Sequence, residues 1–216
     1  MNKILCFSFP RSGHHLLVHL LAQYFSGNIE FPEGKSHNKK LDVGDLHYCE
    51  FYRHCYTLGC DDPLVNFQKN HDFELNSTLP LEWSHIVQCR HPIESVISWI
   101  ERFDRRITDM DSWHWLAKER ILHWKKFMHK WAIECLPLSI VPYHNLVKNP
   151  QLYLEKIIRG MAVKNIDFDL ISKIKAPERS LRDVRKSPFF DANKFESYEL
   201  MVLDELEYLE IPTLFH

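Results

Sequence analysis

Residues 4–17 decide the fold, and they read Ile4-Leu5-Cys6-Phe7-Ser8-Phe9-Pro10-Arg11-Ser12-Gly13-His14-His15-Leu16-Leu17. Residues 4–9 are apolar with almost no alternation, a pattern typical of a strand that is buried on both faces of a parallel sheet. Residues 13–24 predict a helix, because apolar side chains recur there at helical spacing. The chain therefore begins with a buried strand that turns directly into a helix.

The rest of the chain alternates strands and helices in the same way. Short apolar runs predict strands at 64–68, 86–89 and 139–141. Apolar side chains at helical spacing predict helices at 92–100, 112–135, 151–161, 170–174 and 198–209. This alternation predicts a three-layer α/β fold with a central, mainly parallel sheet flanked by helices. There is no internal repeat and no Gly/Ser linker, so residues 1–216 are predicted to form one domain.

Two regions of the chain need separate predictions. Residues 27–62 are polar and irregular, with a short helix predicted around 45–56. The long helix at 112–135 carries a Trp-rich stripe, for which core packing is favoured over a binding platform. The members of this stripe are Leu116, Trp124, Phe127, Met128 and Trp131.

The charge is nearly balanced, since 27 Lys and Arg against 29 Asp and Glu give a net charge of −2 with histidine neutral. Such a balance argues against a broad nucleic-acid-binding surface, which carries a large basic excess. It leaves room for one concentrated anion site. Basic residues gather at 173–186 and acidic residues at 191–210, and composition does not choose between two solvated faces and an anion site.

The ends and the cysteines indicate a soluble, cytoplasmic protein without membrane insertion. The N-terminus lacks the longer apolar segment and the cleavage site of a signal peptide, and the apolar stretch 16–25 is too short to span a bilayer. Cys49, Cys55 and Cys60 lie near His47 and His54, yet their C-x5-C-x4-C spacing matches no common zinc pattern. Ordinary packing, a labile disulfide and a zinc site remain the alternatives for this cluster.

The turn at 9–13 is a candidate phosphate site. Backbone N–H groups at the start of a helix lack intrahelical partners, and the helix dipole adds positive potential there. Arg11 and Ser12 would add side-chain donors, and Gly13 would allow a close approach; an ordinary strand-to-helix turn is the alternative. The pattern G-x-x-x-x-G-K-[ST] is absent, which argues against an ATPase or a small-molecule kinase.

A second strand-to-helix segment, 89–99, has Arg90 at the strand end and Ser98 eight residues later (98 − 90 = 8). Ligands of open α/β sheets bind at the carboxyl ends of the strands, so these two turns could hold the two ends of a doubly phosphorylated nucleotide.

Together these segments resemble the sulfotransferase family that uses 3′-phosphoadenosine 5′-phosphosulfate (PAPS). Residues 10–13, Pro-Arg-Ser-Gly, are similar to its 5′-phosphosulfate loop, and Arg90 with Ser98 is similar to its 3′-phosphate signature. Residues 143–150, from Tyr to Pro, are similar to its tyrosine-led segment, and residues 185–187, Arg-Lys-Ser, resemble its late Arg-Lys-Gly segment. The four matches occur in the family's order and cover nearly the whole chain.

The resemblance implies a P-loop-like sulfotransferase fold and PAPS as cofactor, with no metal. The chain departs from the family at His14 and His15, where Ser or Thr is usual, and at Ser187, where Gly is usual. The cofactor-binding residues that it implies are Arg11, Ser12, Gly13, His14, His15, Arg90, Ser98, Tyr143, Arg185, Lys186 and Ser187.

The resemblance also implies the catalytic residues. Lys69-Asn70-His71 resembles the family's Lys-x-His element, in which His is the base and Lys contacts the sulfuryl oxygens. Imidazole suits this role because its unperturbed pKa is about 6.5. Arg11 is a third catalytic candidate, as a stabiliser of the leaving group or as a plain phosphate clamp. The alternatives to His71 as base are Asp72, Glu50, His14 and His37.

The resulting hypothesis is a sulfotransferase that acts on a hydroxyl or amine of a small-molecule or saccharide acceptor. Residues 27–62 would form the acceptor side, with an aromatic wall or a satellite core made by Phe31, Tyr48, Phe51, Tyr52 and Tyr56. The rival hypotheses are a non-catalytic nucleotide-binding module, a P-loop-type small-molecule kinase and a zinc protein.

Overall fold

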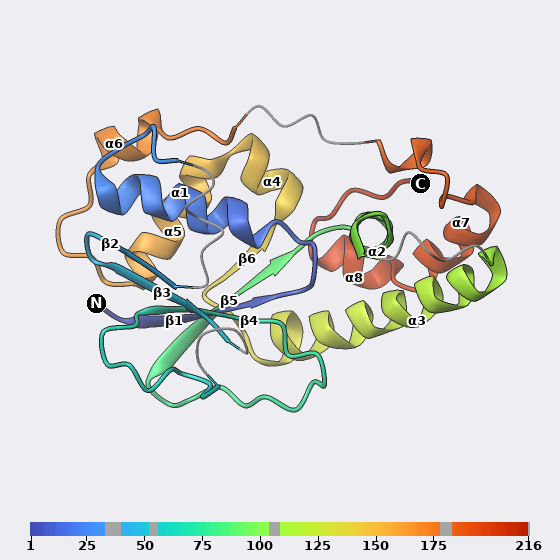
Figure 1. Ribbon diagram of the computed structural model, residues 1–216, viewed down its shortest axis with the longest axis horizontal. Coiled ribbons are helices and arrows are strands. Elements are labelled where there is room, and N and C mark those ends of the chain that lie inside the picture. The colour runs from blue at the N-terminus through green and yellow to red at the C-terminus, as the bar shows by residue number, and fades with distance from the viewer. Residues whose placement is uncertain (33–39, 52–55, 104–108, 178–182, 216) are drawn as a thin grey trace.

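A six-stranded sheet forms the centre of the protein in the computed structural model, which describes residues 1–32, 40–51, 56–103, 109–177 and 183–215 (Figure 1). The strand order is β2-β3-β4-β1-β5-β6, and every neighbouring pair is parallel except β2 with β3. The strands are β1 Lys3–Ser8, β2 Lys40–Val43, β3 Leu46–Glu50, β4 Phe67–Asn70, β5 Trp83–Cys89 and β6 Ser139–Pro142. The prediction of an α/β protein with a mainly parallel sheet is confirmed.

Helices cover both faces of this sheet and so complete three layers (Figure 1). One face carries α1 His14–Ser26, α4 Tyr143–Lys148, α5 Pro150–Gly160 and α6 Phe168–Lys173. The other face carries α2 Pro92–Phe103, α3 Met110–Met128, the π-helical segment η2 His129–Glu134, the 3₁₀ turn η3 Val184–Lys186, α7 Ala192–Leu200 and α8 Leu203–Tyr208.

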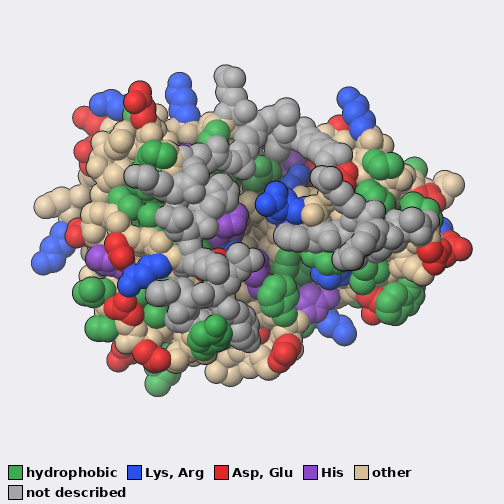
Figure 2. Space-filling model, in the orientation of Figure 1, with side chains coloured by type: hydrophobic (Ala, Val, Ile, Leu, Met, Phe, Trp, Pro, Cys, Tyr) green, Lys and Arg blue, Asp and Glu red, His purple; other side chains and the backbone are tan. Residues whose placement is uncertain are grey.

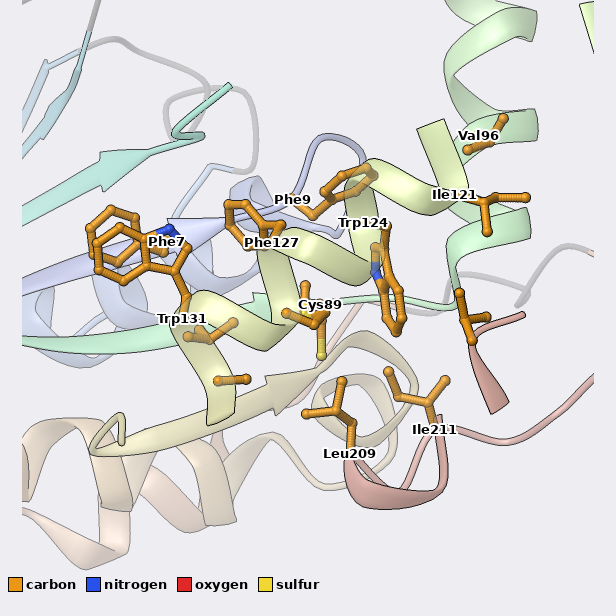
Figure 3. Packing of buried hydrophobic residues seen from close by; sticks show 14 of the residues in the cluster. Phe7, Phe9, Cys89, Val96, Ile121, Trp124, Phe127, Trp131, Leu209 and Ile211 are labelled. Carbon is orange, nitrogen blue, oxygen red and sulfur yellow. The ribbon is translucent and has the colours of Figure 1, made fainter. Parts of the chain in front are cut away.

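The central strand β1 supplies both halves of the core. Ile4 and Cys6 pack with the α1 side, whereas Leu5 and Phe7 pack with the α3 side, as the alternation of side chains along a strand requires. The rings of Phe7 and Trp131 stack with their centroids 3.4 Å apart, and Figure 3 shows this pair at one end of the packed cluster. Full burial of such a side chain contributes about 1.5–3 kcal/mol, so this packing fixes the position of the β1–α1 turn.

The helix predicted at 45–56 is wrong, because its first half is strand β3 of a hairpin. Val43-Gly44-Asp45-Leu46 forms a tight connection in which Gly44 has φ +53° and lies against the Phe25 carbonyl, where a Cβ would be only 2.2 Å away. Leu46 and Tyr48 then alternate inward from β3. Glycine-aspartate turns of this kind favour hairpins, and the prediction missed that signal.

Three other boundaries differ from the prediction. The strand predicted at 64–68 begins at Phe67, and the helix predicted at 198–209 breaks into α7 and α8 around Val202, whose backbone is not helical. The long helix changes to π-helical hydrogen bonding near its end, where the Cys135 N–H donates to the Lys130 carbonyl. In the predicted stripe, Leu116 is only half-buried, and Trp113 and Ala117 are buried instead.

Several predicted positions lie outside the described residues: His37, Tyr52, His54, Cys55, Arg179 and Arg182. Across the described part of the chain, the longest apolar helices fall short of what a membrane crossing needs.

Candidate functional site

The carboxyl ends of the parallel strands bring most of the predicted residues to one edge of the sheet. A predicted segment or residue follows each of four strands at this edge: the turn 9–13 follows β1, His71 follows β4, Arg90 follows β5 and Tyr143 follows β6. The chain leaves β1 toward β4 by way of α1 on one face and continues from β5 to β6 by way of α2 and α3 on the other. This change of direction is the switch point at which open α/β sheets bind ligands. Figure 2 shows histidine and Lys or Arg side chains gathered near the middle of one face.

The turn 9–13 has an unusual backbone. Arg11 and Gly13 are both left-handed, with φ +68° and +84°, on either side of Ser12. Gly13 is the N-cap of α1 and has no side chain to satisfy the first N–H groups of the helix. The hydroxyl of Ser12 is buried and has no hydrogen-bond partner among the described residues. The turn therefore offers donors for an anion.

The ring of Tyr143, the first residue of α4, packs on Gly13 of this turn. A Cβ built on Gly13 would lie 2.2 Å from Cδ2 of Tyr143, so only glycine fits beneath the ring. The guanidinium of Arg90 lies over the same ring, with its Cζ 4.8 Å from the ring centroid. The first turn, the end of β5 and the start of α4 are thereby packed together.

The second turn holds Arg90 in a small polar network. Nε of Arg90 and Nε2 of His144 both donate to Oε2 of Glu94, each at 2.8 Å. Burial works to raise the pKa of Glu94, but the His144 hydrogen bond and the Arg90 charge outweigh it and lower that pKa to about 2. The terminal nitrogens of Arg90 make no hydrogen bond to any described residue, so its fork can face an anion.

A hydrogen bond joins the two turns, because Nε of Arg11 donates to Oγ of Ser98 at 3.2 Å. Burial lowers the pKa of Arg11, and the charges of Arg102 and Arg90 lower it further. Burial and two neighbouring positive charges both disfavour the charged form of Arg11, and a bound anion would stabilise it. The structure thus brings together Arg11, Arg90 and Ser98, as predicted.

Lys69 lies deeper than its predicted contact with sulfuryl oxygens suggests. Its Nζ is 2.6 Å from Oε1 of Glu50, and both side chains are about 95% buried on the α1 side of the sheet, with 5% and 4% of their surface exposed. Oppositely charged partners stabilise one another in such a buried position, where a lone charge would be costly. This pair places Lys69 beneath the turn.

His14 is also turned into the protein. Its Nδ1 lies 3.6 Å from Sγ of Cys6, and its Nε2 lies 3.1 Å from the hydroxyl of Tyr48. Burial lowers the pKa of His14 well below its usual value, with further contributions from Lys69 and His15. His14 is therefore neutral, with both ring nitrogens on protein groups, whereas its neighbour His15 is half-buried at the first turn of α1.

His71 has a defined tautomer. Its Nδ1 hydrogen-bonds the backbone carbonyl of Ser8, at the end of β1. A carbonyl oxygen only accepts, so Nδ1 carries the proton and Nε2 of neutral His71 carries the lone pair. This arrangement suits a base that acts through Nε2.

The neighbouring Asp72 anchors the same loop. One carboxylate oxygen accepts from Nζ of Lys130 at 3.0 Å and from Nε1 of Trp131 at 2.8 Å, and the other accepts from the Ser77 N–H at 2.9 Å. Burial would raise the pKa of Asp72, but these hydrogen bonds lower it overall. A strongly held carboxylate of low pKa is a poor base, so this geometry favours His71 over Asp72.

The late segment 185–187 packs against α2. Oγ of Ser187 donates to Oε1 of Glu101 at 2.7 Å. Glu101 lies one helical turn after Ser98 on α2. Arg185 is exposed and pairs with Asp183 at 2.9 Å, and Lys186 is exposed as well. The segment therefore lies near the second turn, while its two basic side chains point into solvent.

The region 27–62 divides between core and surface. Tyr48 is buried and Phe31 packs against the same α1-side core, whereas Tyr56 is 79% exposed. No disulfide joins the cysteines of the described chain, Cys49 and Cys60 among them. Over the same residues, no three of His, Cys, Asp and Glu come close enough to hold a metal ion.

Sequence reasoning missed several residues of this site. Glu94 lies four residues after Arg90 on a helix, a spacing that signals an ion pair. Gln88 is fully buried, and its amide has no hydrogen-bond partner in the described chain. It shares the α1 side of β5 with Ile86, below the turn, and no local pattern indicates it.

Comparisons with known proteins add no relative. No model of a known protein family matches the chain, and no curated protein sequence matches it.

Proposed function

We propose that the protein is a sulfotransferase of the P-loop-like sulfotransferase fold. It moves the sulfuryl group of PAPS to a hydroxyl or amine of a small-molecule or saccharide acceptor. The observation that carries this proposal is the Arg11–Ser98 hydrogen bond, which holds two anion-receptive turns side by side. A ligand with phosphate groups at both ends of one nucleotide fits such a pair of turns.

The residues present fit this nucleotide. The buried, unpartnered hydroxyl of Ser12 and the uncapped start of α1 suit a 5′-phosphosulfate. The fork of Arg90 and the hydroxyl of Ser98 suit a 3′-phosphate, and Ser187 hydrogen-bonds Glu101, which lies one helical turn after Ser98 on α2. When bound, the nucleotide supplies an activated sulfuryl group.

The chain's own residues would then position the acceptor and move its proton. Nε2 of His71 takes the proton of the attacking hydroxyl, while Nδ1 keeps its hydrogen bond to Ser8. Arg11 places a fixed positive charge in the turn where negative charge develops. Lys69 lies below the turn as an ion pair with Glu50, which balances most of its charge.

One observation favours a second candidate, a non-catalytic nucleotide-binding module. Lys69 is held by Glu50 at 2.6 Å within the sheet layer, which restricts its reach toward a transferring group. In that case the two turns bind nucleotide and no transfer follows.

The test separates binding from chemistry. Wild-type protein, His71→Ala and the matched control His129→Ala, an exposed histidine of η2, are incubated with ³⁵S-labelled PAPS and a panel of alcohols, phenols, amines and saccharides. Adenosine 3′,5′-bisphosphate (PAP) is titrated into each protein. We expect transfer by wild type and His129→Ala, a loss of about a hundredfold or more in His71→Ala, and equal PAP affinity in all three.

Other outcomes decide against this function. PAP binding without transfer to any acceptor would establish the binding module instead. Absence of PAP binding would refute both candidates, and transfer by His71→Ala at the wild-type rate would remove His71 as the base.

A further inference from the structure

The guanidinium of Arg120 lies between α2 and α3, and it has no anionic partner among the residues that the structure describes. Its Cζ lies 3.7 Å from the centroid of the Trp99 ring, and the side chain is half-buried. Nε of Arg120 is buried and makes no hydrogen bond to any residue that the structure describes, and the side chain has no ion pair there. A buried donor left unsatisfied costs free energy, and a charged one costs more.

Two neighbours of Arg120, His123 and Trp99, connect it to the proposed reaction centre. His123, one turn along α3 from Arg120, lies with its ring centroid 6.1 Å from that of Phe9, the residue that opens the first turn. Trp99 directly follows Ser98, which binds Arg11. Arg120 thus lies on the α2–α3 side of the turn, away from Lys69 and His14 on the α1 side.

Other positive charges lie on α2 and α3 near the proposed site. Arg102 interacts electrostatically with Arg11, and Arg120 and Lys126 both act on His123, where Asp72 opposes them. Asp72 is itself held by Lys130 and Trp131.

The cofactor does not account for Arg120. In the proposed function the two ends of the nucleotide are held by the turn 9–13 and by Arg90 with Ser98. Arg120 instead contacts the ring of Trp99, the residue that follows Ser98. A planar guanidinium fixed on an aromatic face is pre-organised to bind a carboxylate with two parallel hydrogen bonds.

We propose that Arg120, with Trp99 as its platform, binds a carboxylate of the acceptor, so that the acceptors of this protein are acidic molecules. This inference rests on the proposed function for the role of the acceptor. The carboxylate itself can belong to an aromatic acid or to a uronic acid in a saccharide, since both present the same group to the guanidinium.

Binding of matched acid and neutral probes tests this proposal. 4-Hydroxyphenylacetate is compared with 4-hydroxyphenylacetamide, and a glucuronate-containing disaccharide with its carboxyl-reduced form, by calorimetric titration with and without saturating PAP. The proteins are wild type, Arg120→Met, Arg120→Lys and the control Lys118→Met, whose side chain is exposed on the opposite side of α3.

We expect at least one acid to bind wild type and Lys118→Met about tenfold or more tightly than its neutral counterpart. Arg120→Met should abolish this preference, and Arg120→Lys, which keeps the charge without the fork, should keep only part of it. The aromatic and saccharide pairs show which source of the carboxylate is used.

Equal binding of acid and neutral probes to wild type would overturn the proposal, as would an acid preference that survives Arg120→Met. Titration of PAP into the same samples tests the proposed function separately. PAP binding without acid preference defeats this inference alone, and acid preference without PAP binding defeats the proposed function alone.

Discussion

Gly13→Ala tests how the first turn is built. The new Cβ must adopt φ +84° and would lie 2.2 Å from Cδ2 of Tyr143. The left-handed backbone costs about 1–2 kcal/mol for a residue with a Cβ. Relief of the overlap adds about 1–3 kcal/mol, because the Tyr143 ring must leave its place under the Arg90 guanidinium. We therefore expect a total destabilisation of about 2–5 kcal/mol.

The matched control is Gly27→Ala at the other end of the same helix. Gly27 has φ +65°, but a Cβ there meets no atom within 4 Å, so only the backbone term of about 1–2 kcal/mol remains. Urea unfolding followed by far-UV circular dichroism measures both variants, and PAP titration measures the site. Equal destabilisation by the two substitutions, or unchanged PAP affinity in Gly13→Ala, would refute the packing of Tyr143 on Gly13.

Two buried carboxylates give further predictions. Glu94 has a folded-state pKa of about 2 against an ordinary 4.5, so it contributes about 3 kcal/mol above pH 4.5, and this contribution is lost as the pH falls toward 2. Glu94→Gln should flatten the stability profile over that range, and an unchanged acid profile would contradict the assignment. Glu199 is fully buried and accepts hydrogen bonds from His91 and from the backbone N–H groups of Leu214 and Phe215. Glu199→Ala should lower the free energy of unfolding in urea by about 3–5 kcal/mol, whereas the exposed control Glu196→Ala should lower it by about 0.5 kcal/mol. An equal loss in the two variants would show that the hydrogen bonds of Glu199 to His91, Leu214 and Phe215 do not stabilise the fold.

Local patterns were enough to predict the centre of the fold. β1, the turn 9–13 and α1 form one continuous stretch in which apolar spacing and a single glycine fix each element. The edge hairpin β2–β3 was missed because its strands are short and partly polar, and its turn signal is only Gly44-Asp45. Edge strands bury one face or less, so their hydrophobic pattern is weak.

The site was predictable where residues follow strand ends and unpredictable where pairing is long-range. Arg11 and Ser98 meet because parallel strands end at one edge, although they are 87 residues apart. The Glu50 partner of Lys69 and the Glu199 partner of His91 depend on strand register and helix docking, which no local spacing encodes. The exposure of Arg185 likewise follows from tertiary packing.

The most direct test of the nucleotide site is calorimetric titration of PAP and of adenosine 5′-monophosphate into wild type and Arg90→Met. The structure predicts saturable binding of PAP by wild type, with adenosine 5′-monophosphate weaker by about tenfold or more because it lacks the 3′-phosphate. Arg90→Met should weaken PAP by a similar factor and leave adenosine 5′-monophosphate nearly unchanged. Absence of PAP binding, or equal affinity of wild type for the two nucleotides, would contradict a site made of two phosphate-binding turns.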